Sequence, residues 1–368
     1  MRKAKDCSLK TKDQRPKTIL IAPLNWGIGH ATRCIPIINE LIKQGFTPIL
    51  ASDGNSLSLL QKEFPDLKTY NLPSYGIQYA KNASFFKLKL LFQIPKILKK
   101  IKEERIVVKN IIKKENIKGL ISDNRFGVWS DKIPSVYITH QIKVLSGFTT
   151  FFTTKIHQRI INKYNVCWIP DVKETSRLSG KLSNALHLKT KYLYLGVLSR
   201  FSNKLNSNTK INKSKYDILV LLSGQEPQRT LLENKLISEF KSSTKKIVFV
   251  RGIISEKGKI TNTKHITFIN YLLQNDLEKA INKSALIISR SGYSTIMDLA
   301  TLQKKAFFIP TPGQTEQEYL ATHLNELQIA PFCKQNDFTL SKLTVLENYR
   351  GFGEKFKKTS NFSFEIFD

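Results

Sequence analysis

The stretch ALIISRSGYSTIMDLATLQKKAFFIPTPGQTEQEYLA, residues 285–321, decides the fold. Its pattern predicts a strand, a turn of small residues, a helix, a second strand, a polar loop and a second helix, in that order. The two strands are uninterrupted apolar runs, which are typical of strands buried on both faces of a parallel sheet. Strands that alternate with helices in this way predict an α/β domain.

Apolar runs of the same kind recur along the whole chain. In the first half they are residues 18–24, 47–52, 119–123, 135–139, 166–170 and 192–195. In the second half they are residues 217–222, 246–250, 265–268, 285–289 and 306–309. Helical patterns separate them and suit right-handed crossovers between parallel strands. We therefore predict an α/β protein with two Rossmann-like parallel-sheet domains that face a cleft.

The stretch SRFSNKLNSNTKINKSK, residues 199–215, divides the two sets of strands and has almost no core-forming residues, which predicts a linker. A chain of 368 residues also exceeds the size at which single cores stop growing. The predicted units are a disordered basic N-terminus (1–16), a first domain (17–198), the linker (199–215), a second domain (216–345) and a C-terminal segment that packs back on the first domain (346–368).

The charge balance favours anionic partners. The chain has 59 Lys and Arg against 29 Asp and Glu, a net charge of +30, which suits nucleic acid, an acidic membrane surface or phosphorylated substrates. Codon bias on solvated faces is the alternative explanation. The four cysteines form no C-x-x-C pair, which favours a reduced compartment without structural zinc. The absence of a signal peptide and of a long apolar run predicts a cytoplasmic protein.

The loop LNWGIGHATR, residues 24–33, follows the first predicted strand. Gly27, Gly29 and the later Asp53 approximate a dinucleotide-binding fingerprint, but Thr32 stands at the third glycine position. A tight strand-to-helix turn is the structural alternative. We expect the glycines to take positive φ angles and to leave room for a substrate.

The turn in residues 289–295 has the features of an anion site. Hydroxyls and backbone N–H groups gather there at a helix N-terminus, where the helix dipole also favours negative charge; the residues are Ser291, Gly292, Ser294 and Thr295. Asp298 lies one turn further along the helix, where a carboxylate could bind ribose hydroxyls. Glu316 and Gln317 follow the next strand, and such side chains suit the hydroxyls of a sugar.

This segment resembles the donor half of glycosyltransferases with the GT-B architecture, and most of all the MurG family, which adds N-acetylglucosamine to a lipid-linked peptidoglycan precursor. The resemblance implies that Ser291 and Gly292 bind the diphosphate, Asp298 the ribose and Gln317 the donor sugar. By the same resemblance, Ile269 matches the strand end at which the family binds the nucleotide base. Ser223 and Gly224 match the family's second glycine loop. Asp298 stands where the family has Glu, and Glu318 where it has a second Gln.

The implied function is transfer of a sugar, with inversion, from a nucleotide-sugar donor, most simply UDP-linked, to a glycan or lipid-linked acceptor. The donor is then a substrate, and no cofactor is expected. The second domain binds the donor, and the first domain binds the acceptor near Gly27, Gly29 and His140. His30 and Asp123 are the predicted catalytic residues, because a base must take the proton of the acceptor hydroxyl.

The absence of an Asp-x-Asp motif predicts a metal-independent reaction, in which the turn at residues 291–295 and Arg229 or Arg290 neutralise the departing diphosphate. Residues 81–118 combine lysines with apolar residues, which suits a peripheral helix on the inner, anionic face of the cell membrane; a helix pair packed inward is the alternative. Three other functions stay open: a sugar-nucleotide epimerase, a basic nucleic-acid-binding protein without a recognition motif, and a dinucleotide oxidoreductase. We expect no nucleic-acid partner.

Overall fold

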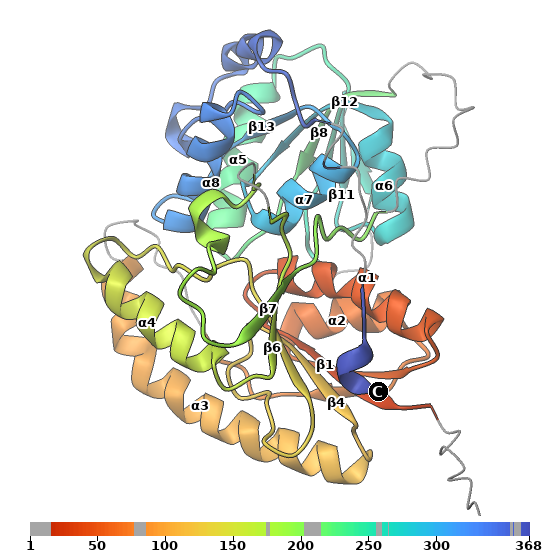
Figure 1. Ribbon diagram of the computed structural model, residues 1–368. Helices are drawn as coiled ribbons and strands as arrows, with labels where there is room; N and C mark the ends of the chain where they lie inside the picture. Colours follow the sequence, from red (N-terminus) through yellow and green to blue (C-terminus); the bar gives the residue numbers. More distant parts are fainter. Residues whose placement is uncertain are drawn as a thin grey trace, which may run out of the picture.

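The computed structural model describes residues 16–76, 86–173, 177–201, 215–254, 260–263, 265–353, 356 and 362–368. Figure 1 shows two α/β domains stacked on one another, with α1 of the first domain close below α7 of the second. The prediction of two Rossmann-like parallel-sheet domains is confirmed. The predicted N-terminal region lies outside the described residues except for Pro16, and residues 202–214 of the predicted linker (199–215) lie outside them as well.

The first domain is built on a seven-stranded parallel sheet with the order β3-β2-β1-β4-β5-β6-β7. Its strands are β1 (Thr18–Pro23), β2 (Thr47–Ser52), β3 (Thr69–Asn71), β4 (Gly119–Asp123), β5 (Ser135–Ile138), β6 (Val166–Ile169) and β7 (Lys191–Tyr194). Its helices are α1 (Gly29–Lys43), α2 (Gly54–Glu63), α3 (Phe86–Lys114) and α4 (Thr150–Ile161), with short 3-10 helices at Gly147–Thr149 and Gly180–Ser183.

The second domain is built on a six-stranded sheet with the order β10-β11-β9-β8-β12-β13. Its strands are β8 (Tyr216–Leu221), β9 (Ile247–Val250), β10 (Ile260–Asn262), β11 (Ile266–Ile269), β12 (Ser284–Ser289) and β13 (Ala306–Phe308). Its helices are α5 (Gln228–Phe240), α6 (Gln274–Asn282), α7 (Tyr293–Thr301) and α8 (Thr315–Glu326), followed by 3-10 helices at Gln335–Asp337, Leu340–Asn348 and Glu365–Phe367. The edge strand β10 is antiparallel to β11.

Strand β1 shows why these runs must be apolar throughout. Ile19 and Ile21 pack into the core cluster that contains the buried residues of α1 and α2, whereas Leu20 and Ala22 pack into the cluster that contains Val108 of α3. Successive side chains of a strand point to opposite faces, so both faces of this sheet are covered by helices. β8 repeats the arrangement, with α5 on one of its faces.

The C-terminal segment contacts the first domain. The Phe364 ring lies 5.8 Å from those of Phe46 and Trp168, and Lys17 Nζ donates to the Phe367 carbonyl at 2.9 Å. Figure 1 shows this end of the chain beside β1. The segment therefore returns from the second domain to the first.

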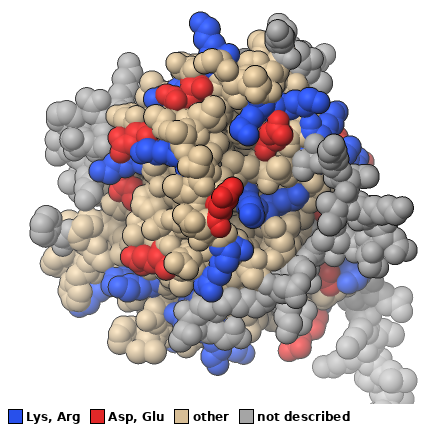
Figure 2. Space-filling view, turned by 90° about the horizontal axis from the view of Figure 1, so that it is seen from above, with Lys and Arg blue, Asp and Glu red and all other residues tan. Residues whose placement is uncertain are grey.

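The surface of the second domain, viewed from above in Figure 2, carries Lys, Arg, Asp and Glu side chains interspersed on a largely uncharged background. The described Lys and Arg side chains on this face therefore do not form a positively charged patch. Among the described residues, no helix is long and apolar enough to span a bilayer.

Candidate active site

The carboxyl ends of three neighbouring strands bring the predicted first-domain residues together. β1, β4 and β5 are adjacent in the sheet; Asp123 is the last residue of β4, and His140 follows β5 by two residues. His30 lies in the first turn of α1, which follows β1. Ligands of open parallel sheets bind at these strand ends, so this edge is the expected position for chemistry.

His30 and Asp123 form a hydrogen-bonded pair. His30 Nδ1 lies 2.8 Å from Asp123 Oδ1, and the His30 side chain keeps 17% of its surface exposed while that of Asp123 is fully buried. Burial alone would raise the pKa of the Asp123 carboxyl, but Arg33 and His30 outweigh it and hold this pKa at about 2. A buried carboxylate with this lowered pKa is suited to orienting His30, so of the two predicted base candidates the geometry favours the partly exposed His30.

Arg33 is the residue that the sequence analysis missed. Its guanidinium donates to both carboxylate oxygens of Asp123 and also lies 3.0 Å from His140 Nδ1. Arg33 is one helical turn from His30 on α1, and a basic residue on the buried face of that helix was the available signal. Because Arg125 pairs with Glu104 and Asp53 instead, Asp123 and Arg33 are each other's charge partners.

His140 meets the second domain. Its Nε2 lies 2.7 Å from Glu316 Oε1, and Gln141 Nε2 donates to Glu316 Oε2 at 2.8 Å. Burial is the main cause that lowers the pKa of His140, and the Glu316 carboxylate offsets only part of it. Burial would raise the pKa of Glu316, yet its contacts with His140 and the charges around it lower this pKa. A neutral imidazole and an ionised carboxylate thus join the two domains.

The first glycine loop lies at the same interface. Gly27 has φ +82° and nothing within 4 Å of where a Cβ would be. Gly29 is the first residue of α1 and does not have a positive φ, so that expectation is wrong for Gly29: it begins a helix. A Cβ at Gly29 would lie 3.2 Å from Ser294 Oγ, which donates to the Gly29 carbonyl at 2.8 Å. The domains touch at Gly29.

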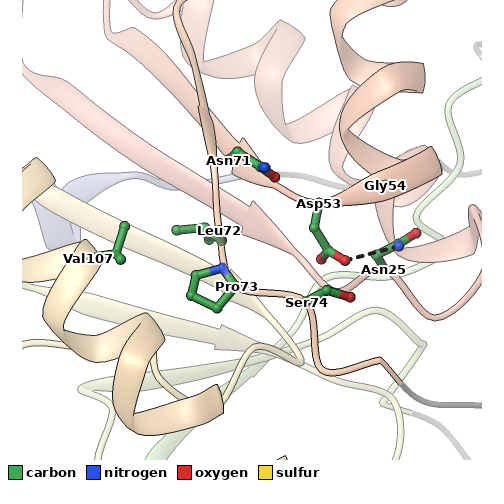
Figure 3. A pocket seen from close by; sticks show the side chains of 8 residues that line it. All are labelled: Asn25, Asp53, Gly54, Asn71, Leu72, Pro73, Ser74 and Val107. Carbon is green, nitrogen blue, oxygen red and sulfur yellow. Dashed lines mark hydrogen bonds between the residues drawn. The ribbon is translucent and has the colours of Figure 1, made fainter.

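A pocket of about 510 Å³ opens beside this loop in the first domain (Figure 3). Asn25 and Asp53 lie side by side in its lining, with Asn25 Nδ2 donating to Asp53 Oδ2 at 3.1 Å. The other residues that line it are Gly54, Asn71, Leu72, Pro73, Ser74 and Val107. Amide, hydroxyl and apolar groups together suit a hydroxyl-rich ligand.

The helix α7 presents its N-terminus to the interface from the second domain. Its N-cap is Gly292, and no described side chain caps it, so the backbone N–H groups of the first turn are available to an anion. Nothing lies within 4 Å of a Cβ built on Gly292, which leaves room for a ligand to approach the backbone. Ser291 Oγ is turned away and donates to the Gln317 carbonyl at 2.7 Å; Thr295 is partly exposed.

The predicted ribose-binding side chain, Asp298, has other partners. Asp298 is buried and accepts from Ser199 Oγ at 2.7 Å and from Arg200 Nε at 3.1 Å. Burial raises its pKa despite the Arg200 cation. The Asp298 carboxylate, one methylene shorter than that of Glu, is thus held against the crossover between the domains. Ser199 and Arg200, the first two residues of the predicted linker, form this contact.

The predicted cations near the diphosphate are also occupied. Arg229 pairs with Glu226 and with Glu233, whose Oε2 lies 2.8 Å from Arg229 Nη1. Arg290 is buried and donates to backbone carbonyls and to Gln335 Oε1, and burial lowers its pKa to about 9. Neither guanidinium is free to neutralise a leaving group, because both stabilise the domain itself.

The remaining predicted donor residues lie on loops and strand ends of the second domain. Ser223 and Gly224 follow β8, with Gly224 exposed at φ +105°. Ile269 ends β11, and its carbonyl accepts from the Arg251 N–H at 2.8 Å. Gln317 Oε1 accepts from the Thr311 N–H at 2.9 Å. Among the described residues, no three His, Cys, Asp or Glu side chains gather as metal ligands.

Comparison with known proteins identifies glycosyltransferases among the similar sequences. Residues 225–358 match the model of the glycosyltransferase family 28 C-terminal domain. The chain is 22% identical over 292 residues to an uncharacterized glycosyltransferase of Methanopyrus kandleri, covering 76% of this chain and 81% of that protein. It is 23% identical to the UDP-N-acetylglucosamine–N-acetylmuramyl-(pentapeptide) pyrophosphoryl-undecaprenol N-acetylglucosamine transferase of Haemophilus ducreyi, covering 86% and 84% of the two chains.

The fold has solved counterparts as well. The crystal structure of the glycotransferase of kitacinnamycin superposes with a TM-score of 0.59 at 13% identity and covers 90% of this chain and 89% of that one. The two-domain arrangement is thus that of the GT-B fold. These similarities favour the glycosyltransferase hypothesis over the epimerase, nucleic-acid-binding and oxidoreductase alternatives.

Proposed function

We propose that this chain uses His30 as the base that activates the acceptor hydroxyl. The chain is a glycosyltransferase of the GT-B fold that resembles the MurG-type enzymes and transfers a sugar from a nucleotide-sugar donor. The observation that carries the proposal is the His30–Asp123 pair, which lies at the interface opposite the open N-terminus of α7. Asp123 orients the imidazole and stabilises the cation that forms when His30 takes a proton.

The donor in this proposal is UDP-linked. Its diphosphate rests on the N–H groups of the first turn of α7, and its departure needs no bound metal ion because those N–H groups and the helix dipole stabilise the developing charge. A direct attack by the deprotonated hydroxyl inverts the configuration of the sugar. The relatives named for UDP-N-acetylglucosamine support this choice of donor.

The acceptor in this proposal carries a glycan on a lipid. Its hydroxyl-rich part would occupy the pocket beside Asn25 and Asp53, and the lipid would remain in an anionic membrane on which the first domain lies. The exposed Phe151 and Phe152 of α4, with Lys155 beside Phe151, support this orientation. The chain would then act on the cytoplasmic face of the cell envelope.

The test is to measure UDP affinity and turnover on the same variant. For His30→Ala we expect the calorimetric affinity for UDP to stay within about threefold, since His30 belongs to the other domain, whereas release of UDP from UDP-N-acetylglucosamine falls by about 10²–10⁴. His187→Ala, at an exposed histidine of the same domain, is the matched control. Unchanged turnover in His30→Ala would remove His30 from the reaction.

A further inference from the structure

His30 Nδ1 has two neighbours of opposite kind. Asp123 Oδ1 and Arg33 Nη2 each lie 2.8 Å from it. A carboxylate only accepts hydrogen bonds and a guanidinium only donates them, so Nδ1 of the neutral ring serves one of the two at a time. When Nδ1–H donates to Asp123, Nε2 keeps the lone pair that a base needs. When Nδ1 accepts from Arg33, the proton is on Nε2 and the ring cannot take another there.

Arg33 has a second imidazole partner that restrains it. Its Nη1 lies 3.0 Å from His140 Nδ1, and because Arg33 can only donate, this Nδ1 must be unprotonated. The proton of the neutral His140 ring is then on Nε2, which lies 2.7 Å from Glu316 Oε1 and donates to it. Glu316 thereby selects the tautomer of His140 that can hold Arg33. With the other tautomer, two donors would face each other.

Glu316 belongs to the second domain, in the first turn of α8. Both its carboxylate oxygens are bound by the first domain, through His140 and Gln141. The His140 ring also stacks on Tyr293 of α7, with 4.0 Å between ring centroids and 15° between planes. The contacts of His140 with Glu316 and Tyr293 therefore exist only when the two domains are in contact.

We propose that Glu316 sets the tautomer of His30 through His140 and Arg33, so that His30 is a competent base only while the start of α8 is seated on the first domain. Without Glu316, His140 no longer keeps the tautomer that accepts from Arg33, so the Arg33–His140 hydrogen bond is lost. Arg33 then donates to His30 Nδ1. Arg33, His140 and Glu316 are in this scheme positioning residues. The inference rests on the proposed function, in which His30 is the base.

The experiment records the imidazole ¹⁵N spectrum of the whole chain with ring-labelled histidine, at a pH where the histidines are neutral. The chain has six histidines, and His30→Ala identifies the His30 resonances by their loss. In the unaltered chain we expect His30 Nε2 in the unprotonated region of the spectrum. In Glu316→Ala we expect it to move to the protonated region, and the rate of UDP release from UDP-N-acetylglucosamine to fall at least about tenfold.

Two further variants separate this scheme from a general loss of domain contact. Gln141→Ala removes a hydrogen bond of similar length to the same carboxylate but keeps the His140–Glu316 contact, so the His30 spectrum should not change. His140→Asn presents an amide oxygen in place of Nδ1 and cannot switch tautomer; in that background, Glu316→Ala should no longer affect His30. The relay is overturned if Glu316→Ala leaves the His30 nitrogens unchanged, or if Gln141→Ala shifts them equally.

Failure of the relay and failure of the base proposal give different results. The spectrum reports the His30 proton whether or not His30 takes part in turnover. An unchanged spectrum in Glu316→Ala together with an inactive His30→Ala rejects the relay and keeps the base. A shifted spectrum in Glu316→Ala together with a fully active His30→Ala keeps the relay and rejects His30 as the base.

Discussion

His157 is a buried histidine outside the site, on α4, whose Nε2 lies 3.0 Å from the Tyr137 hydroxyl. Burial lowers its pKa from 6.5 to about 4, and the nearby Gln141 backbone opposes this change only in part. Between these two pH values the unfolded chain binds a proton at His157 that the folded chain does not. The contribution of His157 to stability is therefore present above about pH 6.5 and is lost as the pH falls towards 4.

We predict that His157→Gln weakens the acid sensitivity of the fold. Gln can still donate to the Tyr137 oxygen but does not titrate. The free energy of unfolding is measured by urea titration at pH 7 and at pH 4. We expect its decrease between these pH values to be smaller in this variant than in the unaltered chain, by on the order of 3 kcal/mol. His187→Gln, at an exposed position, is the control. Equal losses in all three proteins would show that His157 does not titrate as a buried neutral group.

Single residues also show what the sequence could predict about the site. It placed His30, Asp123 and His140 at strand ends, because parallel strands bring their carboxyl ends to one edge. It could not predict their hydrogen-bond partners: Arg33 and Arg125 are both compatible with Asp123 in sequence, and only packing assigns Arg33 to it. Asp298 matched a family position, yet Arg200 from the crossover holds it.

Among elements, α3 and α4 cover the same face of the first sheet. β4 and β5 pair in parallel with Leu120 opposite Ser135 and Ser122 opposite Tyr137, so these residues share a face. Leu120 packs in the cluster of α3 and Tyr137 in that of α4. α4 nevertheless leaves Phe151 and Phe152 exposed, at 61% and 67%. Exposed aromatic side chains beside lysines are typical of a membrane-binding face.

We predict that this face of α4 binds anionic membranes. Lys155 Nζ lies 4.2 Å from the centre of the Phe151 ring, so apolar and cationic groups meet there. Phe151→Ser with Phe152→Ser should reduce co-sedimentation with phosphatidylglycerol vesicles at least about tenfold, as two large apolar groups are lost. Leu186→Ser, which removes a 79% exposed side chain elsewhere, should have no effect. Binding that persists in the double variant would exclude α4 as the membrane contact.

Strands were predictable from the sequence where both of their faces are buried. The strand at residues 47–52 and the strand at residues 119–123 were predicted with the bounds they have, since each has an apolar centre (residues 49–51 and 120–121) between turns. β3 (TYN) and β10 (ITN) were missed because three residues that include polar ones show no apolar run, whereas the equally short β13 (AFF) was predicted because it is apolar throughout. β10 also reverses direction, which alternation of strands and helices does not predict.

At the scale of the whole molecule, the chain crosses between its domains twice. It passes once from β7 to β8 and returns with the segment that carries Phe364 and Phe367. A Cβ at Gly119 would collide with the Phe367 ring, so the ring packs directly on the start of β4. The returning C-terminal segment thus supplies part of the core of the first domain.

We predict that Phe367→Ala destabilises the first domain selectively. Phe367 is 3% exposed, and truncation of a buried Phe costs about 3–5 kcal/mol because its contacts are lost and a cavity is left. In calorimetry, the variant should show an early transition from the first domain, followed by a second one that UDP shifts upward, since UDP binds the other domain in the proposed function. Phe152→Ala, at an exposed phenylalanine, is the control. A transition temperature equal to that of the control would show that the returning segment does not support the first domain.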